Sequence, residues 1–125
     1  MDFNSHLGLE LLDAGADFMR ARCAVDDHLR QPYGLVHGGV LASMAETLAS
    51  VGTALGVAER GDIAVGQSNT TNFLRPILEG TIHAEGRPRH RGRTSWIWDV
   101  ELTDDAGNVC AISRLVIAVR PQRAG

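Results

Sequence analysis

The sequence predicts an α+β fold, in which one long central helix packs against an antiparallel sheet of about five or six strands. The prediction rests on the order of segments along the chain: two strand-like segments, one long helical segment, then about four strand-like segments joined mostly by short turns. Short turns join antiparallel strands, whereas parallel strands need a longer crossover. The 125 residues, 44% hydrophobic and 22% charged, fit a single domain spanning residues 1–125.

The strands are predicted from alternation and from the residues that interrupt them. Residues 19–25 alternate with the period of a half-buried strand, and residues 7–12 are expected to pair before them. Four later segments are strand-like and are broken by Gly, Pro or Asp: 63–73, 80–88, 94–103 and 109–119. Residues 104–108, Asp-Asp-Ala-Gly-Asn, are predicted to form the hairpin turn between the last two segments.

A long helix is predicted from Gly38 to Ala58, where no proline occurs and apolar residues recur with helical spacing. At about 100° per residue, the apolar set centred on Leu41, Leu48 and Leu55 faces one way. The opposite face carries Ser43, Glu46, Thr47 and Ser50. Because the segment has one ionisable side chain among small and aliphatic residues, both faces of the helix are expected to be covered.

Composition excludes several classes of function. The net charge of −3 argues against general nucleic-acid or anionic-membrane binding. All 12 basic residues are arginine, which excludes a lysine Schiff base and a phosphate-loop lysine. Cys23 and Cys110 lack metal-ligand spacing and are expected to be buried free thiols. The sequence has no signal-like N-terminus and no run of 18 apolar residues, so we expect a cytoplasmic protein without a membrane partner or a metal ion.

Glu46 is the first candidate for catalysis. A carboxylate with no charged neighbour on a covered helix is typical of a functional site; the alternative is an exposed residue on a polar face. Ser50 lies one turn further on, at i+4, close enough to share a water molecule or a substrate atom with the carboxylate. The alternative for Ser50 is simple helix packing.

His37, Gly38 and Gly39 open the same helix. The first N–H groups of a helix have no partner within it and carry the positive end of its dipole, so this turn is a candidate oxyanion site. The alternative is that the glycines let the helix begin close to another backbone. Glu46 lies eight residues after Gly38, or about 12 Å along the axis, too far for both to reach one carbonyl. If they act together, two antiparallel helices of a symmetric dimer must each supply one of them.

A basic stretch lies between the second and third of the later strand segments. Within seven residues it contains Arg87, Arg89, His90, Arg91 and Arg93. Guanidinium groups bind phosphates well, so the stretch is a candidate site for a polyphosphate or a 3′-phosphate. The alternative is a strand edge guarded by charge. Nucleic-acid binding is disfavoured because no aromatic residues are interleaved with the arginines.

The longest motif is the segment from Gln31 to Thr47, QPYGLVHGGVLASMAET. Together with Val65-Gly66 and the segments 72–75, 90–93 and 113–115, it resembles the signature of hotdog-fold acyl-CoA thioesterases. The similarity is to the branch of 4-hydroxybenzoyl-CoA and 1,4-dihydroxy-2-naphthoyl-CoA thioesterases, which is related to the phenylacetyl-CoA thioesterases. Because the latter commonly have Asp in place of Glu46, the resemblance favours an aryl-CoA substrate. It also implies a helix wrapped by an antiparallel sheet, a homodimer that forms the active sites, and often a homotetramer.

The resemblance also implies roles for individual residues. Glu46 would be the nucleophile or the general base, the Gly38 N–H the oxyanion donor, and Ser50 the group that holds the hydrolytic water. Gln31 and His37 would orient the thioester and its loop. The segments that would contact CoA contain Gly66, Phe73, Leu74, Arg75, Pro76, His90, Arg91, Gly92, Arg93, Thr94 and Ser95. CoA is then part of the substrate, and no separate cofactor or metal is expected.

The chain departs from the family pattern in two places. It is expected to begin close to its first strand, without the N-terminal helix that many members carry, and Phe73 stands where some relatives have a histidine. Two other functions on the same fold are alternatives: a non-catalytic acyl-CoA-binding module and a hydratase. The hydratase is disfavoured because the sequence has no Asp-His pair about five residues apart at a helix entrance.

Overall fold

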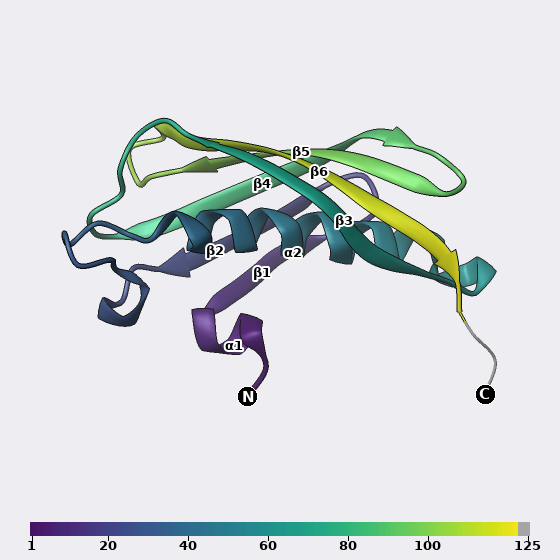
Figure 1. The fold of residues 1–125 in the computed structure, drawn as a ribbon, viewed down its shortest axis with the longest axis horizontal. Helices are drawn as coiled ribbons and strands as arrows, with labels where there is room; N and C mark the ends of the chain where they lie inside the picture. Colours follow the sequence, from purple (N-terminus) through teal and green to yellow (C-terminus); the bar gives the residue numbers. More distant parts are fainter. Residues whose placement is uncertain (123–125) are drawn as a thin grey trace.

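Across residues 1–122, which the computed structural model describes, six strands form one antiparallel sheet in the order β1-β2-β4-β5-β6-β3 (Figure 1). The strands are β1 (Leu9–Ala14), β2 (Met19–Ala24), β3 (Asp62–Phe73), β4 (Thr81–Arg91), β5 (Ser95–Thr103) and β6 (Val109–Pro121). This confirms the predicted α+β fold class and each predicted strand to within a few residues. The turn at residues 104–108 is also confirmed, since the Asp104 N–H bonds to the Asn108 carbonyl and Gly107 has a φ of 84°.

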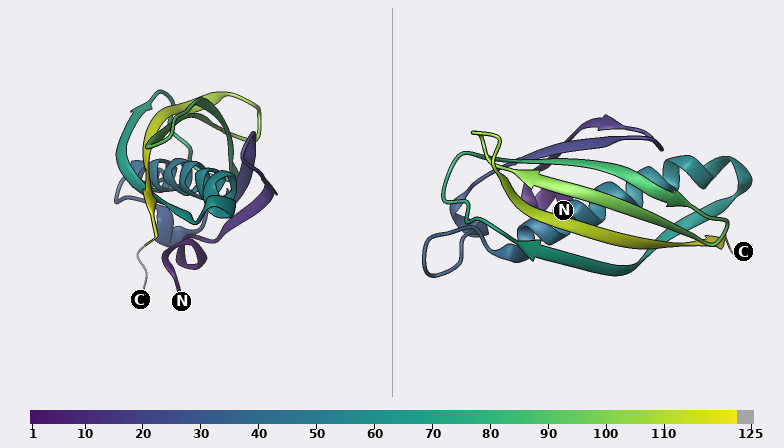
Figure 2. Two further views of the ribbon diagram at one scale, coloured as in Figure 1. Left: turned by 90° about the vertical axis from the view of Figure 1, so that its right-hand side faces the viewer. Right: turned by 90° about the horizontal axis from the view of Figure 1, so that it is seen from above.

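The long helix α2 (Gly38–Val57) is followed by a 3-10 turn, η2 (Ala58–Arg60), and preceded by another, η1 (Asp27–Leu29). His37 caps the start of α2, because its Nδ1 accepts a hydrogen bond from the Gly39 N–H at 2.8 Å. The sheet curves round α2 and encloses one side of it (Figure 2). The buried helical residues are Val40, Leu41, Met44, Ala45, Leu48, Ala49, Gly52, Thr53 and Val57.

Two tryptophans of β5 fix how closely the sheet approaches the helix. A β-carbon on Gly52 would lie 2.4 Å from the Trp98 ring, and one on Gly56 would lie 2.3 Å from the Trp96 ring. The glycines therefore provide the room for the indoles. Trp98 is fully buried, and its Nε1 donates to Thr53 Oγ1 at 2.9 Å, so its one polar atom is satisfied.

The other side of α2 is not covered, and the prediction that both faces are buried is wrong for the single chain. Glu46 is exposed, and Leu55, predicted on the apolar face, is 51% exposed. Glu46 is exposed because the sheet encloses only one side of the helix, whereas Leu55 lies on the same face as the buried Leu41 and Leu48 but near the end of the helix. The helical segment Gly38–Arg60 is long and apolar enough to cross a membrane by length and composition, with a mean hydropathy of 1.4 in its 18-residue window. Half of that window is buried inside the protein, as in the core helix of a soluble protein.

The expectation that the chain begins without an N-terminal helix is wrong: a short helix, α1 (Phe3–Leu7), precedes β1 and lies below the open side of α2 (Figure 1). Asp2 caps it by accepting a hydrogen bond from the Ser5 N–H at 2.8 Å, and Gly8 ends it with a φ of 81°. Thr47 Oγ1 donates to Asn4 Oδ1 at 3.0 Å and ties α1 to α2. A five-residue helix is too short to give a periodic signal in the sequence.

The register shifts in four of the strand pairs, and two of these shifts decide which candidate site residues face the helix. In β3 the register with β6 shifts between Gly66 and Ser68, and in β4 the register with β5 shifts between Pro88 and His90. An extra residue in one strand reverses the alternation beyond it. Gly66, before the first shift, and Asn69, after it, pair with Ile117 and Leu115, both buried, and therefore face α2 alike.

Candidate active site

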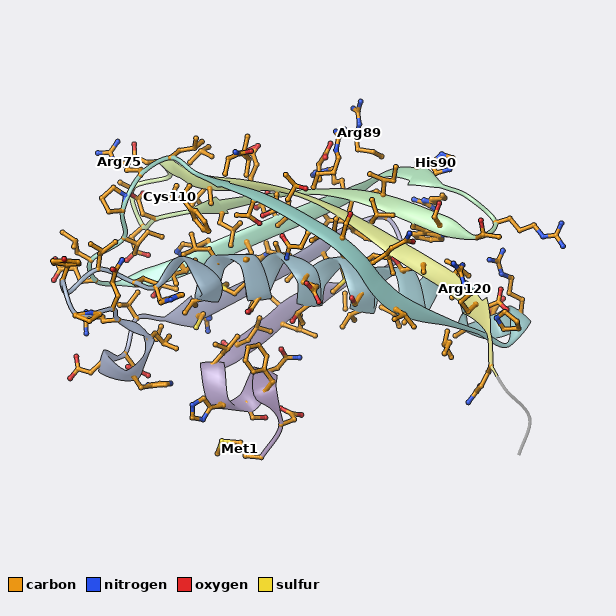
Figure 3. All side chains as sticks on the ribbon, in the orientation of Figure 1. Met1, Arg75, Arg89, His90, Cys110 and Arg120 are labelled. Atoms are coloured by element: carbon orange, nitrogen blue, oxygen red, sulfur yellow. The ribbon has the colours of Figure 1, made fainter. Side chains whose placement is uncertain are left out.

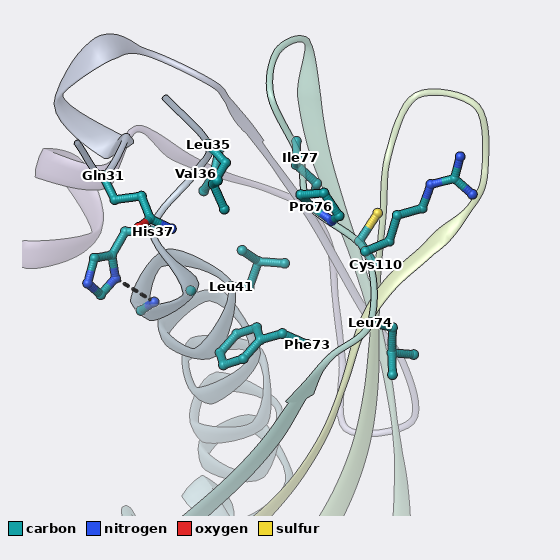
Figure 4. A pocket seen from close by; sticks show the side chains of 13 residues that line it. Gln31, Leu35, Val36, His37, Leu41, Phe73, Leu74, Pro76, Ile77 and Cys110 are labelled. Atoms are coloured by element: carbon teal, nitrogen blue, oxygen red, sulfur yellow. Dashed lines mark hydrogen bonds between the residues drawn. The ribbon is translucent and has the colours of Figure 1, made fainter. Parts of the chain in front are cut away.

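The start of α2 borders a pocket of about 530 Å³, here called the helix-start pocket (Figure 4). It is lined by Gln31, Leu35, Val36, His37, Gly38, Gly39, Leu41, Phe73, Leu74, Arg75, Pro76, Ile77 and Cys110. The structure thus brings together three of the predicted catalytic residues with the predicted CoA-contacting segment Phe73–Pro76. Most of the remaining lining is aliphatic, as in a site that excludes water around a few polar groups.

The backbone N–H groups of the first turn differ in their availability. The Gly39 N–H donates to His37 Nδ1, and the Val40 N–H donates to the His37 carbonyl at 3.0 Å. The Gly38 N–H has no hydrogen-bond partner among residues 1–122. Gly38 lines the helix-start pocket, so this free donor lies at the edge of the pocket and at the positive end of the helix dipole.

Phe73, at the end of β3, covers this turn. A β-carbon on Gly38 would lie 2.8 Å from Phe73 Cζ, so the ring contacts the backbone that carries the free N–H. The alternative explanation for the glycine pair was the close approach of another backbone, but the close neighbour of Gly38 is the side-chain ring of Phe73. Phe73 remains 57% exposed, which leaves most of the ring available to a ligand.

Glu46 lines a different pocket of about 410 Å³, the Glu46 pocket, on the open side of α2. Its lining is Phe3, Asn4, Gly39, Ala42, Ser43, Glu46, Thr47, Ser50, Val51 and Asn69. Ser50 shares it, as predicted from the i+4 spacing. Gly66 also faces the carboxylate: its β-carbon position lies 3.2 Å from Glu46 Oε2. The resemblance implied a CoA contact for Gly66, whereas within this chain its neighbour is Glu46.

Asn69 is a site residue that the sequence analysis missed. Its Nδ2 donates to Glu46 Oε1 at 3.2 Å and to the Ala42 carbonyl at 3.0 Å. A polar residue within a strand gives no signal of its own, and the shift at residues 66–68 decides that it faces the helix. The sequence contains no marker of that shift apart from Gly66, since glycine within a strand can indicate a bulge.

The basic stretch lies at the opposite end of the sheet from the helix-start pocket. Figure 3 shows Arg75 near one end and His90 near the other. The residues from His90 to Ser95 include the β4–β5 turn, which the Gly92 N–H closes by bonding to the Ser95 carbonyl at 2.8 Å. Gln31, His37 and Gly38 of the same chain therefore do not meet the second predicted CoA-contacting segment.

Several of these arginines already have partners. Arg91 pairs with Asp17 and lies over the Trp96 ring, with Cζ 5.4 Å from the ring centre, because the register shift in β4 places it on the helix side. Arg89 Nε lies 3.4 Å from Asp99, and Arg87 lies over the Phe18 ring. Part of the stretch thus has a structural role within the chain, made of ion pairs and contacts with aromatic rings, which differs from the charged strand edge given as its alternative.

Cys110 is the other reactive group that borders the helix-start pocket. It is fully buried, and burial raises the pKa of its thiol. The protonated thiol is a weak nucleophile. Both cysteines are free and buried, as predicted.

A six-stranded antiparallel sheet curved round one long helix is the hotdog fold, and the comparisons with known proteins give the class of protein as thioester hydrolase. Residues 33–111 match the thioesterase superfamily, and the chain belongs to that family. The proofreading thioesterase EntH of Cronobacter turicensis is 37% identical over 114 residues, covering 91% of this chain and 82% of that relative.

Solved structures agree with this assignment. Thioesterase HI1161 of Haemophilus influenzae has a TM-score of 0.89 and 35% identity, covering 94% of this chain and 82% of that one. A mutant of thioesterase PA1618 of Pseudomonas aeruginosa has a TM-score of 0.92 and 33% identity, covering 97% and 87%. The resemblance, the hotdog fold and the thioesterase class predicted from the sequence are confirmed.

Proposed function

We propose that the chain hydrolyses an aryl-CoA or related acyl-CoA thioester to the free acid and CoA, at sites formed between two copies of the chain. The observation that carries the proposal is the separation of two groups on one helix. Gly38 offers its free N–H to the helix-start pocket, and Glu46 lines the Glu46 pocket. About 12 Å of helix lies between them, so a single thioester carbonyl cannot use both groups of one chain.

A second copy of the chain supplies the missing group. On the open face of α2, Glu46 is exposed and Ser50 is half-buried, and among residues 1–122 the edge strand β3 pairs only with β6. A two-fold axis beside β3 would place two α2 helices antiparallel and bring the start of one helix toward Glu46 of the other. Two such dimers then form the proposed homotetramer.

The same two-fold axis would bring the second predicted CoA-contacting segment close to the helix-start pocket of the other chain. Residues 90–95 lie at the end of the sheet far from the helix-start pocket of their own chain. In an antiparallel dimer, the partner's copy of this segment approaches that pocket. Arg75 and Arg93 are the candidates for phosphate contacts, since each is exposed and makes no side-chain ion pair among residues 1–122.

The proposed chemistry is addition to the thioester carbonyl. The Gly38 N–H stabilises the oxyanion that develops, and Gln31 and His37 orient the thioester. Glu46 acts either as the base that takes a proton from a water held by Ser50, so that this water adds and the CoA thiolate leaves, or as a nucleophile that expels the CoA thiolate and forms an anhydride, which water then hydrolyses. Neither route needs a cofactor or a metal ion. An aryl group fits the apolar lining that Phe3 and Val51 give to the Glu46 pocket. We place the protein in the cytoplasm, where CoA esters are available as substrates.

Hydrolysis of a panel of aroyl-CoA and aliphatic acyl-CoA esters, followed by release of free thiol, tests the proposal. Glu46→Ala and Glu46→Gln should abolish most turnover, whereas Glu59→Gln, on the exposed turn after α2, should leave it unchanged. Full activity of both Glu46 variants would refute the catalytic role. If CoA esters raise the Tm but none is cleaved, the non-catalytic binding module is the correct function.

Mixed dimers test the shared site. Gly38→Pro together with Phe73→Leu removes the donor N–H and makes room for the proline ring, and proline is tolerated at the first position of a helix; this double variant is here called the Gly38→Pro subunit. If each site combines Glu46 of one subunit with Gly38 of the other, mixing inactive Glu46→Ala and Gly38→Pro subunits restores one intact site in each heterodimer. Random mixing should then recover about one quarter of wild-type activity. No recovery, with heterodimers verified by differential tags, would place both groups in one subunit.

A further inference from the structure

Four polar side chains form one line of hydrogen bonds from β6 through β3 to the open side of α2. The Ser113 and Thr71 hydroxyl oxygens lie 2.8 Å apart, and Thr71 Oγ1 lies 2.7 Å from Asn69 Oδ1. The Asn69 amide nitrogen then reaches Glu46 Oε1 at 3.2 Å. The line thus ends on the proposed catalytic carboxylate.

The chemistry of the groups fixes the direction of every bond in this line. A carboxylate and a backbone carbonyl only accept, so the nitrogen of the Asn69 amide must face Glu46 and Ala42. Its oxygen therefore faces Thr71, whose hydroxyl donates its single hydrogen to it. Thr71 has no second hydrogen, so the hydroxyl of Ser113 must donate to Thr71. Each group orients the next, and the last donor is directed at Oε1.

The line is anchored in the core. Ser113 is 5% exposed and lies directly opposite Thr71 in the β3–β6 ladder. A buried hydroxyl needs a hydrogen-bond partner, so Ser113 holds Thr71 in the rotamer that faces Asn69. The backbone register, set by strand pairing, thus determines where the Asn69 amide points.

The two carboxylate oxygens of Glu46 have different surroundings. Oε1 accepts from Asn69, whereas Oε2 lies over Gly66, which has no side chain to cover it. The register shift between residues 66 and 68 makes this possible, because without it Gly66 and Asn69, three positions apart, would face opposite sides of the sheet.

We propose that Asn69 is a positioning residue for Glu46: it holds Oε1 and leaves Oε2 as the oxygen that reacts, and Thr71 with Ser113 orients the Asn69 amide. This inference rests on the proposed catalytic role of Glu46. Whether Oε2 adds to the carbonyl or takes a proton from water, a carboxylate free to rotate would present it less often in the productive geometry. Breaking this line of hydrogen bonds should therefore lower kcat more than it changes KM.

Steady-state kinetics on the intact homo-oligomer test this. Asn69→Ala should lower kcat about 10- to 100-fold with little change in KM. Thr71→Val, which keeps the shape but removes the hydroxyl, should lower kcat by a smaller factor, and Thr71→Ser should restore it. Thr70→Val is the matched control, since Thr70 lies on the other face of β3 opposite Arg114; it should behave as wild type.

A double variant separates this inference from the proposed function. In the Glu46→Ala background, Asn69→Ala should cause no further loss of residual activity, because the carboxylate that it positions is absent. A further loss of the same factor, or a single-variant effect confined to KM, would overturn the positioning role while Glu46 stays catalytic. Full activity of Glu46→Ala would instead refute the proposed function. If Asn69→Ala does not fold, the Thr71→Val and Thr71→Ser pair decides: equal kcat values would overturn the inference.

Discussion

Glu46 Oε2 lies 3.2 Å from the position that a β-carbon on residue 66 would occupy, so the middle of β3 and the open side of α2 meet at the proposed catalytic carboxylate. The contact is tighter than ordinary van der Waals distance, and the free oxygen of Glu46 faces it. Glycine at residue 66 is therefore required by the side chain of Glu46 and not by its own backbone, since its φ is not positive.

Gly66→Ala should therefore reduce activity without reducing stability. The added methyl displaces the carboxylate by a few tenths of an ångström, and we expect kcat to fall about tenfold. Alanine in an extended strand restricts the unfolded chain, so the free energy of unfolding should stay equal or rise by up to about 1 kcal/mol. Enzyme kinetics and urea unfolding measure the two effects. Gly15→Ala, where the nearest neighbour lies at 3.7 Å, is the control.

A second pair of variants separates the steric role of Gly38 from its role as a donor. Gly38→Ala keeps the N–H but drives a methyl into the Phe73 ring, so activity should fall, and Phe73→Leu in the same chain should recover part of it. Gly38→Pro with Phe73→Leu lacks the donor and should remain about 10²- to 10³-fold below wild type in kcat. Equal activities of the two double variants would contradict the donor role.

Thr53→Val should destabilise the protein although it preserves shape. The valine leaves Trp98 Nε1 buried without an acceptor, which costs about 1–3 kcal/mol. Thr53→Ser retains the oxygen and should recover most of the free energy of unfolding. Urea denaturation of the three proteins measures the differences. Wild-type stability of Thr53→Val would show that the bond to Trp98 contributes little.

The turn between β5 and β6 predicts a dependence of stability on pH. Hydrogen bonds from the side chain and backbone of Asn108 hold the pKa of Asp104 below its usual range. Its stabilising contribution is therefore present above the pKa of the unfolded chain, near 4, and is lost as pH falls through the lower folded-state pKa. The stability difference between wild type and Asp104→Asn should narrow below about pH 4. The stability difference between wild type and Asn108→Ala should narrow over the same pH range. A stability difference that stays constant from pH 7 to pH 2 would refute the stabilising role of the Asp104 carboxylate.

Much of the fold follows from local patterns in the sequence. The absence of proline and the helical spacing between Gly38 and Ala58 predicted α2, and strand periodicity located the six strands. Glu46 and Ser50 were paired by their i+4 spacing, and the distance from Gly38 to Glu46 followed from helix geometry alone. These features depend on neighbours in the chain, which the sequence specifies directly.

Tertiary structure decided which of these residues meet. The register shift in β3 turns Asn69 toward Glu46, and the one in β4 turns Arg91 toward Trp96. Gly66 can mark a bulge, but it does not specify the shift, because the pairing strand sets the register of the whole ladder. The exposure of Glu46 likewise reflects how far the sheet curves. The sequence by itself determined the fold class and the lone carboxylate on its helix, whereas strand pairing decided which side chains hold that carboxylate in place.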